Sequence, residues 1–118
     1  MRTEIIDQRR KFTAGMMLLS GVTHPAQMLF YGSGPEIRGP AMSGILFFFV
    51  GLFLLTRFRL ALWVAIALPL MGGVGAIYRI VDASPTAFTY FHAAIDFVVV
   101  GLCGSILLSP HWRGDGKR

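Results

Sequence analysis

The chain is 118 residues long, with 54% hydrophobic and 14% charged residues, a composition that allows one domain at most. Its 11 Lys and Arg and 6 Asp and Glu residues are too few to cover the surface of a soluble domain, which leaves roughly a third of its unfolded-chain surface exposed. A mean hydropathy of +0.62 therefore excludes a disordered chain, a secreted disulfide scaffold and an ordinary globular enzyme. The single cysteine, Cys103, excludes an intrachain disulfide and a multi-cysteine metal site.

Four apolar runs are long enough to cross a membrane as helices, which takes about 20 residues with about 17 to 25 as the working range. They occupy residues 12–31, 40–56, 60–80 and 85–108. Such runs lack the strict alternation of a membrane-barrel strand, and lipid offers backbone groups no other hydrogen-bond partner. The sequence therefore predicts an all-α fold, in which residues 1–118 form a single four-helix transmembrane bundle.

Short breaks separate the four runs. Gly32-Ser33-Gly34-Pro35 ends the first run, and Gly39-Pro40 predicts a second helix with proline in its first turn. Arg57-Phe58-Arg59 leaves room only for a tight hairpin. Ser84-Pro85 is typical of an N-cap followed by proline at the first helical position, and Ser109-Pro110 ends the last run.

Basic residues predict the orientation, because those of short loops stay on the cytoplasmic side of a membrane. With the N-terminus inside, nine lie on that side: Arg2, Arg9, Arg10, Lys11, Arg57, Arg59, Arg113, Lys117 and Arg118. Only Arg38 and Arg79 lie on the other side. We therefore expect a multi-pass protein of the bacterial inner (plasma) membrane with an uncleaved first span and both termini cytoplasmic. The basic pI follows from this topology and from attraction to anionic lipids, so the bilayer and not nucleic acid is the expected partner.

Two of the runs carry a polar stripe. The first holds four polar residues at helical spacing: Ser20, His24, Gln27 and Tyr31. The last repeats the same spacing with His92, Asp96, Val99 and Cys103. Steps of three and four residues place each set on one face of its helix.

Depth brings the two stripes together. At about 1.5 Å of rise per residue, His24 and His92 each lie roughly 10 Å below the outer ends of their helices. Ser20 and Asp96 both lie at roughly 16 Å, close to the middle of the bilayer. Antiparallel neighbours would therefore pair His24 with His92 and Ser20 with Asp96.

Asp96 needs a partner or a proton, because a carboxylate at the bilayer centre costs about 2.5 to 3.5 kcal/mol on insertion scales. It can be protonated, pair with His92 one turn earlier, or receive Arg79 from the third run. Arg79 can equally extend outward to Asp82. We favour the His92–Asp96 pair.

The second and third runs contribute different kinds of residues at the depth of the two histidines. Gly72, Gly73 and Gly75, after Pro69, remove side-chain bulk and let a neighbour or a ligand approach the backbone. The second run has almost no polar residue between Ser43 and Thr56. Its aromatic residues 47–49 suit lipid or a partner subunit.

These features predict a polar pocket in the outer half of the bundle, formed by Ser20, His24, Gln27, Tyr31, Arg79, His92 and Asp96. The first hypothesis is binding of a small ligand or cofactor in support of a larger membrane assembly. His24 and His92 could ligate a metal or haem between helices, or donate hydrogen bonds to a quinone. Asp96 would then orient His92.

Two further hypotheses stay open. In size and helix number the chain resembles the small multidrug resistance exporters, which implies proton-coupled transport by a homodimer with Asp96 as the protonatable group. The essential carboxylate of that family is a glutamate in the first helix, and residues 12–31 contain none. A looser similarity, again of size and helix number, is to DoxX-like membrane proteins associated with redox enzymes.

The third hypothesis is an accessory subunit without chemistry, in which the polar cluster sets the register of the helices. The sequence contains no nucleophile elbow, glycine-rich phosphate loop or Cys/His zinc spacing. We therefore do not expect an enzyme.

Overall fold

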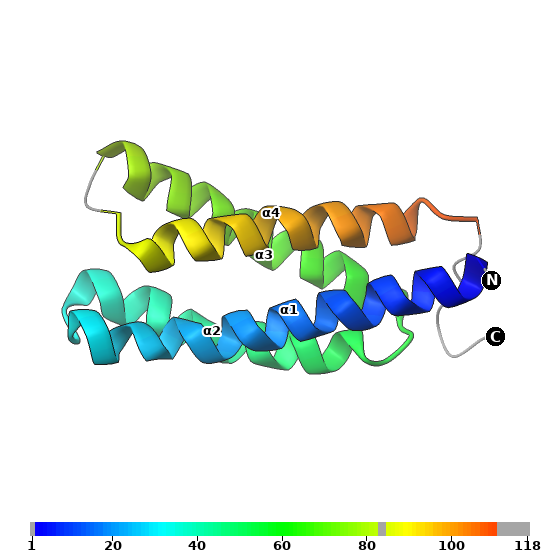
Figure 1. Ribbon diagram of the computed structural model, residues 1–118, viewed down its shortest axis with the longest axis horizontal. Coiled ribbons are helices and arrows are strands. Elements are labelled where there is room, and N and C mark those ends of the chain that lie inside the picture. The colour runs from blue at the N-terminus through cyan, green and yellow to red at the C-terminus, as the bar shows by residue number, and fades with distance from the viewer. Residues whose placement is uncertain (1, 83–84, 111–118) are drawn as a thin grey trace.

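The computed structural model describes residues 2–82 and 85–110, and within them it contains four helices. These are α1 (Arg2–Tyr31), α2 (Pro35–Leu54), α3 (Arg59–Asp82) and α4 (Ala87–Leu107). Figure 1 shows them running along the longest dimension of the molecule, which measures 46 Å. The prediction of an all-α, four-helix fold with short connections is confirmed.

Three of the four helices are long and apolar enough to cross a membrane, namely α3, α4 and the Ile37–Leu54 part of α2. They indicate a multi-pass membrane protein. Helix α1 does not reach the same mean hydropathy, because Ser20, Thr23, His24 and Gln27 interrupt its apolar residues. Its crossing of the membrane therefore stays a prediction.

Helix α1 begins ten residues before the predicted apolar run and is 30 residues long. The apolar run marks where lipid contact could begin, whereas the helix itself continues through the charged residues near the N-terminus. The end of α1 is where the sequence predicts it. Gly32 has a φ of +81°, which a residue without Cβ adopts freely, and its N–H donates to the Met28 carbonyl at 3.1 Å.

The starts of α2 and α4 differ from the prediction. Helix α2 begins at Pro35, with Gly34 as its N-cap, so Pro40 lies inside the helix. Helix α4 begins after Thr86, whose side chain forms a capping box with Thr89. Pro85 precedes this cap, and the predicted N-cap, Ser84, lies outside the described residues.

Glycines let α1 and α2 approach each other closely. A Cβ on Gly21 would lie 2.7 Å from the backbone of Phe48, and one on Gly44 would lie 2.7 Å from the Gly21 carbonyl oxygen. A Cβ on Gly51 would lie 2.9 Å from Leu18 Cγ. Small residues at such crossings replace side-chain bulk by backbone contact. Helices α1 and α2 consequently form one tight pair, and α3 and α4 form the second (Figure 1).

We expect Gly44→Ala to destabilise the protein by about 1 to 3 kcal/mol, because the new methyl group would collide with backbone that cannot move aside. Gly39→Ala on the same helix is the control, since its Cβ would meet nothing within 4 Å, and removing glycine from a helix stabilises it by about 1 kcal/mol. Thermal unfolding in detergent, followed by circular dichroism, measures both. Equal melting temperatures for the two variants would contradict the packing described.

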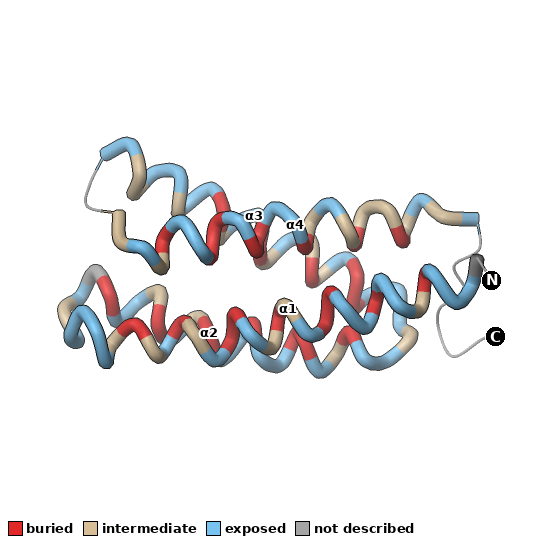
Figure 2. The backbone as a smooth tube through the Cα atoms, in the orientation of Figure 1, coloured by how far each residue is buried: buried red, intermediate tan, exposed pale blue. Residues whose placement is uncertain are grey.

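The half of the bundle that holds the start of α1 and the end of α4 is a packed apolar core. Its fully buried members include Met17, Leu54, Leu62, Val99 and Ile106. Figure 2 shows buried positions along all four helices. The aromatic run of α2 divides between the two environments: Phe47 is buried, whereas Phe48 and Phe49 are exposed. The prediction that the whole run suits lipid or a partner is therefore wrong for Phe47.

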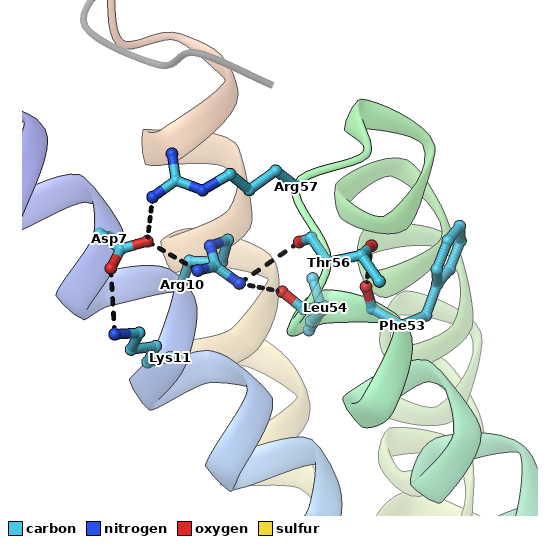
Figure 3. A network of polar contacts seen from close by, with 7 residues as sticks. All are labelled: Asp7, Arg10, Lys11, Phe53, Leu54, Thr56 and Arg57. Carbon is cyan, nitrogen blue, oxygen red and sulfur yellow. Dashed lines mark hydrogen bonds and ion pairs between the residues drawn. The ribbon is translucent and has the colours of Figure 1, made fainter. Parts of the chain in front are cut away.

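A charged network joins the start of α1 to the end of α2 (Figure 3). Arg10 is buried, and its Nη1 donates to the carbonyl oxygens of Leu54 at 2.7 Å and Thr56 at 3.3 Å. Its Nη2 donates to Asp7 Oδ1 at 2.6 Å, and Arg57 reaches the same oxygen at 3.2 Å. Arg10 thus satisfies carbonyls that every helix C-terminus leaves without a partner.

The hydrogen bond from Arg10, together with Lys11, holds the pKa of Asp7 below its usual value despite the opposing effect of partial burial. A carboxyl whose pKa is lower in the folded state adds stability above its unfolded pKa, and that stability disappears as the pH falls through the folded pKa. We therefore expect the melting temperature to fall below about pH 4. Asp7→Asn should reduce this acid sensitivity, and an unchanged slope in the variant would contradict the role of Asp7.

Candidate functional site

A cavity of about 420 Å³ lies between the four helices, in the half of the bundle that holds the end of α1 and the start of α4. Every helix contributes to its wall. Helix α1 provides His24 and Gln27, and α4 provides Thr89, His92 and Asp96. The remaining lining residues, from α2 and α3, are Pro40, Ser43, Phe47, Leu68, Met71, Gly72, Gly75, Ala76 and Arg79.

Three rings from three helices stack at one side of this cavity. The imidazoles of His24 and His92 have centroids 3.7 Å apart and planes at 16°. The ring of Phe47 also stacks on the His24 imidazole, with its centroid 4.9 Å from that of His24 and an interplanar angle of 22°. The two histidines therefore meet at a common depth, as their positions along α1 and α4 predict.

The proton position on His24 follows from its hydrogen bonds. Its Nδ1 lies 2.7 Å from the Ser20 carbonyl oxygen and 3.1 Å from Ser20 Oγ. Because a carbonyl oxygen only accepts, Nδ1 must carry the hydrogen. In the neutral ring this leaves Nε2 as the acceptor nitrogen. Gln27 strengthens the same turn by donating from Nε2 to the His24 carbonyl at 3.0 Å.

His92 is held by Thr23, which lies next to His24 in the sequence. Thr23 Oγ1 is 2.8 Å from His92 Nε2 and also 2.9 Å from the Leu19 carbonyl oxygen. The hydroxyl has one hydrogen, so it donates either to the carbonyl or to the imidazole. In the first case His92 Nε2 is the donor, and in the second it is the acceptor. The contact ties α1 to α4 in both cases.

Asp96 is the unusual member of the site. It is 2% exposed, and its Oδ1 is fully buried without a hydrogen-bond partner among the described residues. The favoured His92–Asp96 pair and the Ser20–Asp96 pairing are both wrong, because His92 bonds to Thr23 and Ser20 to His24. The carboxyl group instead lies against α3, where a Cβ on Gly72 would be 2.9 Å from Asp96 Oδ2.

The other predicted site residues divide into two groups. Gln27 and the half-buried Arg79 line the cavity with His24, His92 and Asp96. Ser20 does not line the cavity, but its hydroxyl contacts Nδ1 of His24. Tyr31 is 43% exposed, and its ring meets Phe88 edge-on at 5.8 Å, away from the cavity lining.

The stacked imidazoles do not suit a metal ion or a haem held between them. A metal lies close to the plane of each ligating imidazole, at about 2.0 to 2.1 Å from its nitrogen for zinc. With nearly parallel planes and centroids 3.7 Å apart, His24 and His92 cannot both aim a lone pair at one ion, and no macrocycle fits between them. The described residues also contain no group of three or more His, Cys, Asp or Glu side chains that could hold a metal.

Thr23, which contacts His92, and Phe47, which lines the cavity, were not predicted as members of the site, although the sequence holds a signal for each. Thr23 lies three residues after Ser20 and four before Gln27, so it belongs to the same helical face. Phe47 lies three residues after Gly44 and four before Gly51, the glycines that mark the inward face of α2. A neighbouring missed residue, Thr89, reaches the cavity from the first turn of α4.

Comparison with known proteins gives no match: no protein family, no curated protein and no solved structure is significantly similar to this chain. The cavity and its hydrogen bonds are therefore the basis of the functional argument.

We expect Asp96→Leu to stabilise the protein by about 1 to 3 kcal/mol, because it removes a buried oxygen that has no hydrogen-bond partner. Thr13→Val is the matched control: Thr13 is fully buried, but its hydroxyl donates to the Arg9 carbonyl at 2.7 Å, so its removal should bring no gain. Thermal unfolding in detergent compares the two variants with the parent. A clear loss of stability in Asp96→Leu would show that the carboxyl group has a structural partner.

Proposed function

We propose that this chain is a multi-pass protein of the bacterial inner membrane, with both termini cytoplasmic, whose cavity binds a small ring-shaped ligand of the quinone type. The observation that carries the proposal is the cavity of about 420 Å³ lined by Asp96, whose carboxyl oxygen Oδ1 is buried without a hydrogen-bond partner. Ligand pockets typically measure about 300 to 1,000 Å³ and combine apolar walls with a few polar groups. A buried polar atom without a partner calls for such an explanation.

The distribution of polar side chains supports the crossing of the membrane by α1. Its polar residues Ser20, His24 and Gln27 are buried, whereas Leu19, Val22 and Leu29 on its outside are exposed and apolar. When neighbouring helices cover its polar face, a helix exposes only apolar side chains to the hydrocarbon of the membrane. The moderate mean hydropathy of α1 is thus compatible with a fourth span.

The charges support the orientation with both termini in the cytoplasm. The end of the bundle that holds Arg9, Arg10, Lys11, Arg57 and Arg59 is the basic one, as the positive-inside rule requires of a cytoplasmic side. Two of these residues also complement helix C-termini: Arg10 donates to the Leu54 carbonyl, and Arg59 Nη2 donates to the Leu107 carbonyl at 3.4 Å.

The polar groups of the cavity match a planar ring that carries oxygen atoms. A ligand carbonyl can accept from the protonated form of Asp96, and a ligand hydroxyl can donate to its ionised form. The stack of His24, His92 and Phe47 provides flat surfaces with which another ring can pack. A metal or haem is not part of the proposal, because the stacked imidazoles do not fit either. The proposal includes that the chain binds this ligand in support of a larger membrane assembly.

Proton-coupled transport through Asp96 is the alternative. It requires the carboxyl group to be reached from both sides of the membrane. In the half that holds the start of α1 and the end of α4, however, the bundle is filled by the buried residues Met17, Leu54, Leu62, Cys103 and Ile106. This packing favours a closed pocket over a pathway. A purely structural role would leave the cavity volume and the unpartnered oxygen of Asp96 without a purpose.

Binding of the tail-less ring 2,3-dimethoxy-5-methyl-1,4-benzoquinone to the purified protein in lipid nanodiscs tests the proposal. We expect Asp96→Leu to weaken binding by about tenfold or more, since a hydrogen bond to a group of this kind contributes about 1.5 to 3 kcal/mol. Gly75→Leu should also weaken binding by filling the cavity. Its control is Gly101→Leu, because a Cβ on either glycine would meet nothing within 4 Å and only Gly75 lines the cavity. Calorimetric titration measures each affinity, and equal affinities in all four proteins would refute the proposal.

A further inference from the structure

The four seams between neighbouring helices are closed to different degrees at the level of the cavity. The α1–α2 seam is closed by backbone contacts at Gly21 and Gly44. The α1–α4 seam is closed by the His24–His92 stack and, further out, by Phe30 against Phe88 with centroids 5.7 Å apart. Because of these contacts, a hydrocarbon chain cannot pass between the helices at these two seams.

The α3–α4 seam is closed in a similar way. A Cβ on Gly73 would lie 3.1 Å from the ring of Phe97, and the neighbouring Gly72 lies against Asp96. The glycines therefore bring α3 close to α4 on the side of the cavity where the carboxyl group lies.

The α2–α3 seam is the open one. Of the neighbouring pairs, α2 and α3 have the smallest interface. At the cavity they meet where Phe47 approaches Gly72, a Cβ on which would be 3.4 Å from Phe47 Cζ. Further out, the lining residues of the two helices are Pro40, Ser43, Gly75, Ala76 and Arg79, and all but Arg79 are small.

The wall of the cavity continues to the outside of the bundle along this seam. Met71 lines the cavity and is nevertheless 73% exposed, and Gly75 is also a lining residue that is exposed. Met42 and Leu46 on α2 and Val74 on α3, each next to a lining residue in the sequence, are exposed and apolar. The opening therefore faces the hydrocarbon region of the membrane proposed above.

We propose that the ligand is a lipid-dissolved amphiphile, a quinone-type ring with a hydrocarbon tail, which enters between α2 and α3 and leaves its tail in this seam. The inference rests on the proposed function and names the class of ligand and its route. The ring lies beside the buried, unpartnered Asp96 carboxyl group, and the tail passes the small residues of the seam to reach the lipid. A water-soluble ligand would need a polar opening, whereas the two exposed lining residues, Met71 and Gly75, are apolar.

A photoreactive probe tests the route: the same benzoquinone ring with a ten-carbon tail that carries a diazirine, incorporated in phosphatidylcholine–phosphatidylglycerol nanodiscs. After irradiation, mass spectrometry of peptides should locate the label on residues 40–47 and 68–76, and excess unlabelled decyl-tailed quinone should abolish it. Label that competes but falls on α1 or α4 would overturn the route while leaving the proposed function intact. Absence of any competed label together with unchanged binding in Asp96→Leu would instead refute both.

A pair of tryptophan variants separates the tail from the ring. Met71→Trp should weaken binding of decyl-tailed quinone by about tenfold, because the bulk added at the opening displaces the tail at a cost of about 1 to 3 kcal/mol, and should weaken binding of the tail-less ring less. Leu70→Trp is the control, since Leu70 is 44% exposed but does not line the cavity. Equal effects of the two variants on the decyl-tailed quinone, or equal effects of Met71→Trp on both quinones, would overturn the inference.

Discussion

The bundle depends on covering one polar face of α1. Ser20, His24 and Gln27 are buried on this face, and polar groups without partners in an apolar medium each cost several kcal/mol. Part of the requirement is met within the helix, because His24 donates to the Ser20 carbonyl and Gln27 to the His24 carbonyl. The rest is met by neighbours: α2 approaches through Gly44, and α4 presents His92 to Thr23. The positions of α2 and α4 on the two flanks of α1 follow from this one need.

Helical spacing and depth were sufficient to predict the fold class, the short connections and the meeting of His24 with His92, because these follow from length and rise per residue. The partner of Asp96 could not be predicted in this way. Depth gives the height of a side chain along the bundle, but not the rotation of its helix. The His92 ring is turned onto His24, and the rotation of α4 directs Asp96 to Gly72 on α3. Two residues spaced by four therefore face different neighbours.

The role of α2 was hidden for a different reason. A run without polar residues gives no hydrophobic periodicity, so the sequence does not distinguish the buried Phe47 from the exposed Phe48 and Phe49. The inward face of α2 is instead marked by Gly44 and Gly51, which come within contact of α1 backbone. Likewise, hydropathy locates the part of α1 suited to lipid, whereas helix formation continues to Arg2 through residues that hydrogen-bond at the bundle end.

The two halves of the molecule differ in how well their interiors are packed and hydrogen-bonded. In the half that holds the start of α1 and the end of α4, the core is filled, and even the buried Arg10 satisfies both terminal nitrogens of its guanidinium group, leaving only Nε without a partner. In the other half, the cavity and the unpartnered Oδ1 of Asp96 occur at the same place. A larger residue at Gly75 would fill the space, and an apolar residue at position 96 would remove the desolvated oxygen. Natural chains depart from such stabilising choices where a site needs them, so the coincidence of both departures at one depth argues for a ligand there rather than for poor packing.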